Sequence, residues 1–391
     1  MKLKCQPGDF QVEELASLAP GEGRFALYRL TKRSLGTLEA VRGIARRWKI
    51  PPERFSYGGL KDRHALTRQY LSIEGGPRRD LRQAHFHLRY LGQVAQAFTS
   101  TDIAGNRFRI VLRDLSAGQM ERLEQGLQAA ARDGVPNYFD RQRFGCVGSS
   151  GHFVARPWCQ GDFQHALWLA LADPSAHDSR RQKADKRYLR EHWGDWAACA
   201  ASVCDSQVRR VLLHLERRGG DFRGGFARID PALRRLYLAA FQSHVWNRML
   251  GRWLQEVCPS EDLFEVPWRG PRLIMYRQLD EATRGQLAAA SLPLPSARLH
   301  LEEGPIRRLV TEVVGEMGLE LRQMRVKYPR DSFFSKGWRH AIFFPEQLRH
   351  ESLPDELHPG RRKLTLRFLL PRGSYATLLI RRIAVAEVPP V

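Results

Sequence analysis

Short runs of alternating apolar and polar residues fill much of the first ~150 positions, a pattern typical of strands that bury one face. The pattern predicts strands at residues 11–15, 24–31 and 106–112. Two longer stretches, 37–49 and 115–133, instead repeat their apolar residues at helical spacing. Because the predicted strands are short and outnumber the helices, we expect an α+β domain built around an antiparallel sheet.

From residue 151 the apolar pattern becomes mostly helical. The longest run, 232–255, has apolar residues on two faces and should be largely buried. Ser243, His244 and Asn247 interrupt one of these faces, and we expect neighbouring backbone groups to satisfy such buried polar side chains. The other helices are predicted at residues 163–171, 186–196, 208–217 and 305–317.

The last part of the chain returns to strand patterns. Residues 337–344 and 363–370 are predicted strands, and the apolar run 378–380 is interpreted as a further segment that needs partners in a sheet.

Charge narrows the choice of partner. The chain carries 63 Lys and Arg residues against 42 Asp and Glu, a formal net charge of +21, which favours a nucleic acid or an anionic membrane. No apolar run approaches the roughly 20 residues that span a bilayer, so a nucleic acid is the better choice. The cations are spread along the chain, as expected for a broad face that binds a folded RNA. The polar segment 173–186 fits either a mobile loop on RNA phosphate or a solvated loop.

The six cysteines form no C-x-x-C pair, and their His neighbours do not repeat at zinc-ligand spacing, so we predict no structural metal. The N-terminal residues lack the apolar core of a signal peptide. We therefore expect a cytoplasmic protein with reduced thiols.

The segment Tyr57-Gly-Gly-Leu-Lys-Asp-Arg-His-Ala-Leu-Thr-Arg-Gln69 carries the strongest chemical signal. It sets one carboxylate, Asp62, between Lys61 and Arg63 after a glycine turn, and a fixed, ionised carboxylate can act as a nucleophile or a base. The alternative is an ordinary hairpin that joins strands at residues 54–57 and 67–73.

This segment resembles the Gly-Leu-Lys-Asp-Arg signature of the TruD family of RNA pseudouridine synthases. Further motifs follow in the family's order along nearly the whole chain: Pro7-Gly-Asp-Phe10, Gly105-Asn-Arg-Phe108, Val135-Pro-Asn-Tyr-Phe139, Gln142-Arg-Phe-Gly145, Arg235-Leu-Tyr-Leu238 and Phe368-Leu-Leu-Pro-Arg-Gly-Ser-Tyr-Ala-Thr377. The likeness is looser at residues 155–230 and 255–290.

The resemblance implies an isomerase that breaks the N-glycosidic bond of a uridine, turns the uracil and rejoins it through C5, without a cofactor. It implies an antiparallel-sheet catalytic domain formed by residues 1–152 and 345–391. A large, mostly helical α/β insertion, residues 153–344, would bind RNA. The expected substrate is tRNA, with uridine 13 of the D-arm as the leading target, and the expected state is a monomer without a required protein partner.

By the same resemblance Asp62 is the catalytic nucleophile, whether it attacks C1′ or assists through a glycal. Phe139 would offer a face to the flipped base, and Asn137 would hydrogen-bond the base or its backbone. The other expected substrate-binding residues are Phe10, Phe368, Arg143 and Lys61. Composition alone would place each Phe in the core, and for each cation a structural role such as an ion pair is an equal alternative.

Two departures from the family pattern bear on this site. Gly58 stands where Ala is common, and Asp140 stands where Gly usually follows the Phe. If position 140 needs a positive φ, Asp would introduce some strain or shift Phe139.

Other function classes stay open at this point. The fold could serve a non-catalytic RNA-binding or chaperone protein, or a synthase acting at a different RNA site. A metal-dependent nuclease is disfavoured, because no second carboxylate ligand set surrounds Asp62.

Overall fold

The computed structural model describes residues 1–176, 178–267 and 272–384. The chain folds into two compact units. One comprises Met1–Val135 and the C-terminal segment that begins at Phe343, and the other comprises Pro136–Ile342. The chain thus leaves the first unit once and returns to it, near the short strands β9 (Val135–Pro136) and β14 (Ile342–Phe343).

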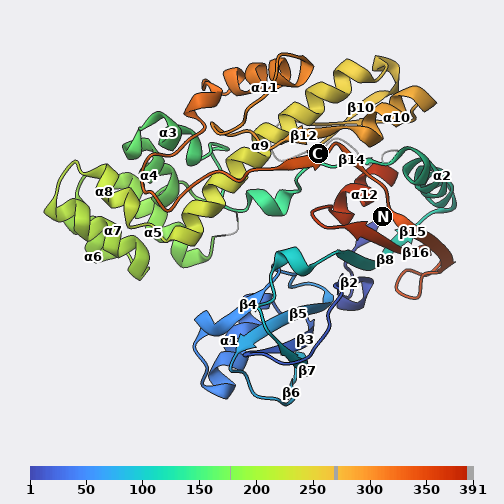
Figure 1. Ribbon diagram of the computed structural model, residues 1–391, viewed down its shortest axis with the longest axis horizontal. Coiled ribbons are helices and arrows are strands. Elements are labelled where there is room, and N and C mark those ends of the chain that lie inside the picture. The colour runs from blue at the N-terminus through green and yellow to red at the C-terminus, as the bar shows by residue number, and fades with distance from the viewer. Residues whose placement is uncertain (177, 268–271, 385–391) are drawn as a thin grey trace. The chain divides into compact units, whose positions relative to one another are not determined.

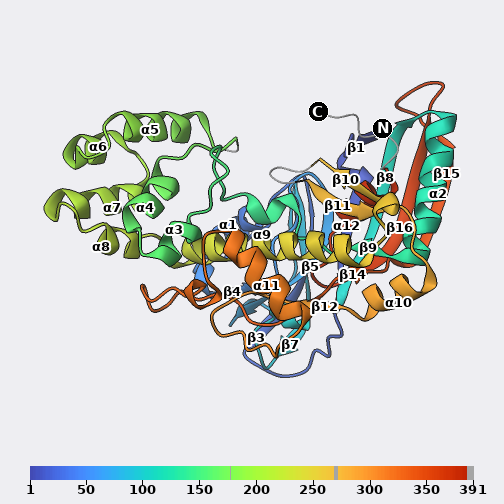
Figure 2. The same ribbon diagram turned by 90° about the horizontal axis from the view of Figure 1, so that it is seen from above.

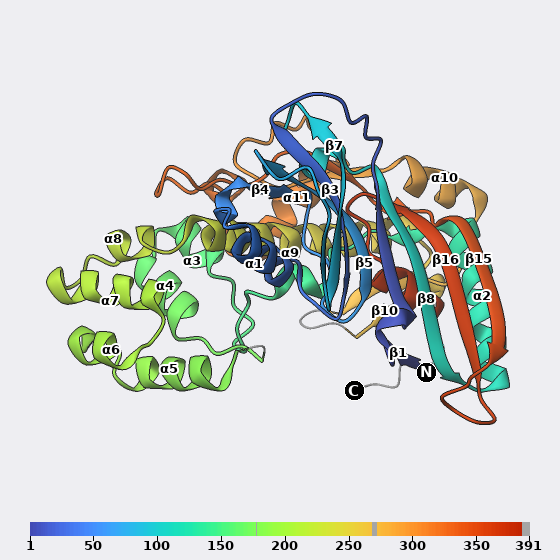
Figure 3. The ribbon, with the colours of Figure 1, turned by 90° about the horizontal axis from the view of Figure 1, so that it is seen from below.

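The first unit is built on one large sheet, in the order β15-β16-β8-β2-β5-β3-β7-β6, with β1 beside β8 and β4 beside β5 (Figures 1 and 3). The pairs are antiparallel except for β2 and β5, which run parallel. The strands are β1 (Lys2–Leu3), β2 (Phe10–Leu15), β3 (Phe25–Arg33), β4 (Phe55–Tyr57), β5 (Leu66–Glu74), β6 (Leu81–Gln83), β7 (Phe86–Val94), β8 (Gly105–Leu115), β15 (Glu346–Pro354) and β16 (Arg362–Pro371).

This arrangement confirms the expected α+β class and two predicted strand pairings. Strand β16 pairs with β8, so the C-terminal strand does rejoin the sheet formed by the first part of the chain. Strands β4 and β5 form the predicted hairpin, whose connection carries Asp62. The hairpin and the candidate site therefore coexist in the same segment.

Helices cover the sheet because alternate strand residues present apolar side chains to them. Helix α1 (Thr37–Trp48) buries Ala40, Val41 and Ile44 in a cluster with residues of β3, β5 and β7. Helix α2 (Ala117–Asp133) packs against α12 (Ala376–Ile383) so closely that a Cβ on Gly126 would lie 2.7 Å from the carbonyl oxygen of Ile383.

The assignment of residues 378–380 to a sheet was wrong, since they lie inside α12. A run of three apolar residues cannot distinguish a strand from a buried helix. The helix buries Ala376, Leu379 and Ile383, which are spaced three and four residues apart and so share one face.

The second unit is organised around α9 (Pro231–Val257), which Figure 2 shows running beside α11. As predicted, this helix is largely buried. The other α-helices and strands of the second unit are α3 (Ala155–Gln160), α4 (Phe163–Leu171), α5 (Arg180–Glu191), α6 (Trp196–Ser202), α7 (Ser206–Arg217), α8 (Phe222–Ala227), α10 (Glu281–Ala289), α11 (Pro305–Glu316), β10 (Leu263–Val266), β11 (Leu273–Tyr276), β12 (Ser291–Pro293) and β13 (Trp338–His340). None of the described helices combines the length and apolar character needed to cross a membrane.

The prediction of a helix at 186–196 and a loop at 173–186 was wrong. Helix α5 begins at Arg180, after Ser179 accepts a hydrogen bond from the backbone N–H of Gln182 and Gln182 reciprocates in a capping box. The helix is polar on most sides, so its start lacked the apolar period on which the prediction relied. Position 177 of that segment lies outside the described residues.

A buried ion cluster joins the N-terminal motif to the returning C-terminal segment. Arg113 of β8 makes two 2.9 Å bonds to the carboxylate of Asp9 and a 2.7 Å bond to Asp355. Burial acts to raise the pKa of Asp355, but bonds from two backbone N–H groups, His358 and Arg113 outweigh it and hold that pKa well below its usual range. Arg113 and Lys363 lower the pKa of Glu356 to about 2.

This cluster should make the first unit acid-sensitive. Both carboxyl pKa values are depressed in the folded state, so their stabilisation is complete above the ordinary values of 3.8 and 4.5 and is lost as the pH falls towards 2. Asp355→Asn should lower the free energy of unfolding at pH 7 by about 3 kcal/mol and flatten its decline below pH 4. Chemical unfolding at pH 7, 4 and 3 measures this. Glu351→Gln, which alters an exposed carboxylate, is the control. Equal acid slopes for the wild type and Asp355→Asn would contradict the assignment.

Candidate functional site

The loop that carries Asp62 is held by a buried lysine of β3. The ammonium of Lys32 donates to the carbonyl oxygens of Leu35, Lys61 and Asp62 at 2.7, 3.2 and 2.9 Å. The Lys32 side chain is fully buried, and this burial lowers its pKa to about 8. Three carbonyl oxygens match the three donors of an ammonium, so Lys32 holds the peptide groups on both sides of the Asp62 Cα.

Residues at the start of α1 and in β5 hold the same loop from other directions. The hydroxyl of Thr37 accepts a 3.0 Å bond from the backbone N–H of Lys61 and donates a 2.8 Å bond to Gln69. The amide of Gln69 donates to the carbonyl oxygen of Gly59 at 3.2 Å. With Lys32, these buried groups leave the Asp62 backbone little freedom to move.

Lys4 pairs with the Asp62 carboxylate. Its Nζ lies 2.6 Å from Asp62 Oδ2, and both side chains are about one-quarter exposed, at 26% and 23%. The same ammonium lies 4.3 Å from the ring centroid of Phe10. Lys4 was missed in the sequence because nothing in the spacing of positions 4 and 62 links them; only the sheet brings the N-terminal segment to this loop.

The two cations flanking Asp62 pair with glutamates. Lys61 Nζ lies 2.9 Å from Glu14 Oε1, whose side chain is completely buried, and 3.1 Å from Asn106 Oδ1. Arg63 pairs with Glu39 at 3.3 Å on the surface. The structure thus gives Lys61 a role in fastening the loop to β2 and β8. A role in substrate binding stays a prediction.

Phe10 and Phe368 lie together in the first unit. The Phe108 ring stacks on Phe368 with a centroid distance of 5.3 Å and contacts Phe10 edge-on at 6.3 Å. Phe10 and Phe368 are 4% and 2% exposed. The structure therefore joins Lys4, Asp62 and these rings in one group, because Lys4 touches both the carboxylate and Phe10.

Asn137 and Phe139 lie together in the second unit, where α9 holds their backbone. The side chain of Asn247 accepts a 2.8 Å bond from the N–H of Phe139 and donates a 2.9 Å bond to its carbonyl oxygen. This confirms that the buried Asn247 is satisfied by neighbouring backbone. Asn137 itself donates to the carbonyl oxygen of His340 at 3.0 Å.

Three side chains surround the Phe139 ring. Trp246 meets it edge-on at 5.5 Å, and the guanidinium carbons of Arg339 and Arg143 lie 4.3 and 5.7 Å from its centroid. Arg143 also donates to the hydroxyl of Ser243 at 3.2 Å, an arrangement that positions the Phe139 segment.

Sequence reasoning missed Arg339. Its guanidinium donates to the carbonyl oxygen of Asn137 at 2.8 Å and to Asn137 Oδ1 at 2.6 Å, while it stacks on Phe139. It lies about 200 positions away from Asn137 in a weakly patterned region, so no local signal could have linked the two.

The departure at position 140 brings no backbone strain. Asp140 has φ −86° and ψ 166°, an ordinary extended conformation, and its carboxylate accepts a 2.6 Å bond from the N–H of Arg141. It caps the short 3-10 turn η4 (Arg141–Phe144) that carries Arg143.

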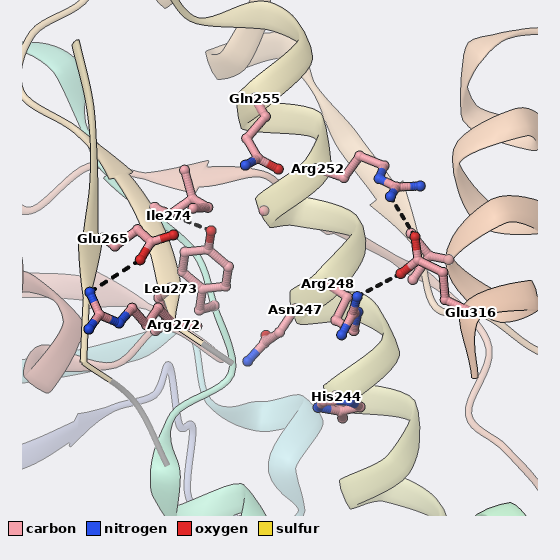
Figure 4. Close-up of a pocket in the computed structure, with 13 residues that line it drawn as sticks. His244, Asn247, Arg248, Arg252, Gln255, Glu265, Arg272, Leu273, Ile274 and Glu316 are labelled. Atoms are coloured by element: carbon pink, nitrogen blue, oxygen red, sulfur yellow. Dashed lines mark hydrogen bonds and ion pairs between the residues drawn. The ribbon is translucent and has the colours of Figure 1, made fainter. Parts of the chain in front are cut away.

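A cavity of about 360 Å³ is lined in part by His244, Asn247 and Arg248 of α9 (Figure 4). Arg248 and Arg252 in its wall both bind Glu316, and Arg272 pairs with Glu265. Burial, with a smaller effect of Arg248, lowers the pKa of His244 to about 4, so this ring is neutral at pH 7. The paired charges and neutral ring make the cavity a poor anion site.

Asn247→Ala should loosen the Phe139 segment. It leaves a buried N–H and a buried carbonyl of Phe139 without partners, so the free energy of unfolding of the second unit should fall by about 2–4 kcal/mol. Chemical unfolding followed by tryptophan fluorescence tests this. Gln255→Ala, an exposed change on the same helix, should be nearly neutral. Equal stabilities of the two variants would refute the anchoring role.

Gly58 can be tested with a paired substitution. An added Cβ would lie 2.3 Å from Ile103 Cδ1, so Gly58→Ala should destabilise the first unit by about 1–3 kcal/mol. Ile103→Val removes that terminal methyl. The double variant should therefore lose less stability than the sum of the two single changes, which a double-mutant cycle of thermal unfolding measures. Strict additivity would show that the loop relaxes away from Ile103.

Comparisons with known proteins cover nearly the whole chain. Residues 1–383 match the family described as tRNA pseudouridine synthase D (TruD). The probable tRNA pseudouridine synthase D 2 of Methanocaldococcus jannaschii is 30% identical over 392 residues, with 98% of this chain and 91% of the relative covered. The tRNA pseudouridine synthase D of Aquifex aeolicus is 26% identical, with 99% of each chain covered.

The fold agrees with these likenesses. The crystal structure of a putative tRNA pseudouridine synthase D from Methanosarcina mazei superposes with a TM-score of 0.71 at 25% identity, with 98% of this chain and 93% of that chain covered. Sequence and fold therefore lead to one conclusion: the chain belongs to the TruD family, and it is an isomerase of the tRNA pseudouridine synthase type.

Proposed function

We propose that this enzyme converts uridine 13 in the D-arm of tRNA to pseudouridine, with Asp62 as the catalytic nucleophile. The observation that carries the assignment is the Asp62 loop itself. Its backbone is fixed by Lys32, and its carboxylate is oriented by Lys4 at 2.6 Å. A carboxylate held in one orientation at partial exposure is ready to react with a sugar carbon.

The reaction requires no net addition or loss of atoms. The bond between C1′ and N1 of the uridine breaks, the detached uracil turns, and a bond forms between C1′ and C5. The C5 proton then leaves, and N1 gains a proton. Asp62 would act at the sugar during bond cleavage. Aromatic rings would support the flipped base, a role that we assign to Phe139 with Phe10 and Phe368.

The remaining site residues receive supporting roles. Asn137 would contact the base or shape the turn beneath it, and Arg143 would hold Phe139 or a nearby phosphate. Lys61 would keep the loop on the sheet through Glu14. Residues 1–152 and 345–391 would form the catalytic domain, of which 385–391 lie outside the described residues, and residues 153–344 the RNA-binding insertion.

tRNA is the expected substrate, and the proposal needs neither a cofactor nor a protein partner. A monomer in the cytoplasm would suffice, since the expected catalytic and RNA-binding parts belong to one chain.

Carbodiimide primer-extension mapping of tRNA treated with the purified protein in EDTA tests the proposal. The wild type should produce a new stop at position 13, whereas Asp62→Asn should reduce pseudouridine formation by at least roughly 1,000-fold. Asp80→Asn makes the same chemical change at an exposed carboxylate of the first unit and should keep full activity.

Each alternative has its own outcome. A stop at another position would keep Asp62 as the nucleophile and discard the target. Undiminished activity of a folded Asp62→Asn enzyme would refute the catalytic role.

A further inference from the structure

A loop of the second unit, formed by residues other than those of the candidate site, concentrates positive charge. The basic loop, residues 321–336, lies between α11 and β13 and passes beside α3 (Figures 1 and 2). It carries Arg322, Arg325, Lys327, Arg330 and Lys336 against a single acidic residue. All five cations are exposed.

The basic loop is irregular but firmly held. The indole N–H of Trp158 donates to the carbonyl oxygen of Tyr328 at 2.7 Å, and the Gln242 side chain donates to that of Ser335 at 2.8 Å. Met324, within the loop, has a fully buried side chain. These anchors pre-organise the cations, which reduces the entropy lost when a ligand binds.

The acidic residue of the loop, Asp331, forms an ion pair with a buried arginine. Asp331 accepts a 2.6 Å bond from Arg234 of α9, which is 2% exposed and also donates to Ser332. Asp331 thus serves to fasten the loop, and its charge does not offset the exposed cations on the outer side.

Two hollows flank the loop and share Arg325 and Lys327. One, of about 540 Å³, is also lined by Arg223 and Arg322, and the other, of about 430 Å³, by Arg298 and Arg330. No carboxylate lines either hollow among the residues that the structure describes.

Arg322 of the loop pairs with Glu320, but other cations of the loop and its two hollows have no such partner in the described part of the chain. Within the described ranges, no ion pair is formed by Arg298, Arg325, Lys327 or Arg330. In the cavity of Figure 4, by contrast, Arg248 and Arg252 both bind Glu316. Neighbouring like charges repel each other, so a pre-formed unpaired cluster is suited to a polyanion that supplies the missing charge.

Aromatic residues accompany these cations. Phe333, within the loop, is 67% exposed, and Trp338, two residues beyond it, is 54% exposed. The Arg223 guanidinium lies 4.4 Å from the ring centroid of Tyr328. Cations interleaved with exposed rings are typical of single-stranded nucleic acid sites, where phosphates contact the cations and bases stack on the rings.

We propose that the basic loop is an RNA-binding site of the second unit. It takes phosphates of the RNA backbone in its two hollows and stacks an unpaired base on Phe333. The identity of the RNA as tRNA rests on the proposed function. An anionic membrane fits less well, because among the described residues only Phe333 and Trp338 are large, strongly exposed apolar side chains at the loop.

Salt-dependent binding of tRNA to the full-length protein tests the phosphate contacts. Arg325→Ala/Lys327→Ala/Arg330→Ala should weaken binding at least about tenfold and reduce the slope of log K against log salt by about 2–3. The control Arg209→Ala/Arg217→Ala/Arg218→Ala removes the same charge from exposed positions on and just after α7 and should change affinity much less. Equal losses in the two variants would overturn the proposal, because they would reflect net charge alone.

Phe333→Ala tests stacking separately. It should weaken binding about tenfold without changing the salt slope, since no charge is removed. Ser335→Ala, an exposed position in the same loop, is the control. Wild-type affinity of Phe333→Ala would refute the stacking role. Loss of binding by the triple variant to vesicles of anionic lipid, with tRNA binding intact, would instead identify a membrane site.

Binding and catalysis are measured independently. If the wild type binds tRNA but makes no pseudouridine at position 13, the proposed function fails while the basic loop can still be assessed. If the wild type is active and the triple variant binds tRNA with unchanged affinity and salt slope, the basic loop fails alone.

Discussion

The Asp62 loop depends on one buried charge. Removing an ammonium from water is costly, and Lys32 recovers that cost only because three carbonyl oxygens converge on it. Those carbonyls belong to the turn before α1 and to the peptide groups of Lys61 and Asp62. The ammonium therefore links a strand, a helix start and the Asp62 loop, and any shift of the Asp62 backbone leaves part of a buried charge unsatisfied. Sheet packing beneath the loop maintains this constraint, since β3 cannot move without disturbing β5 and β7.

The second unit solves a similar problem with neutral and cationic side chains. Phe139 lies in an extended segment without a neighbouring strand on the α9 side, and Asn247 supplies the donor and acceptor that a strand would provide. Arg339 completes the arrangement with bonds to Asn137 and a stacked contact to the ring. In both units a buried polar side chain fixes the backbone beside a residue of the family motif. Such bonds are costly to leave unmade, and this makes the local geometry specific.

Charge has different uses in different parts of the molecule. Arg113 and Arg234 are buried and bind carboxylates, so they fasten segments that are distant in sequence. Arg248 and Arg252 form ion pairs with Glu316, so part of their positive charge is compensated within the protein. Arg325, Lys327 and Arg330 of the basic loop have no such partners among the described residues, whereas Arg322 pairs with Glu320. A net charge of +21 by itself favours a polyanionic partner, and the pattern of pairing indicates which surface is available to it.

The sequence by itself determined the α+β class, the β4–β5 hairpin, the buried character of α9 and, through motifs spread over the chain, the family. Periodicity and motif order are local properties, and each can be recognised without knowing what lies opposite. The sequence pattern did not distinguish the short apolar run of α12 from a strand, and it did not reveal the start of the polar helix α5. Only the tertiary structure decided that Lys4 pairs with Asp62, that Lys32 holds the loop from beneath, that Arg339 binds Asn137 and that Asp331 is neutralised by Arg234. These partners lie from about 30 to about 200 positions apart, and the energy of an ion pair or hydrogen bond depends on the distance between atoms and on burial, neither of which is encoded at any one position.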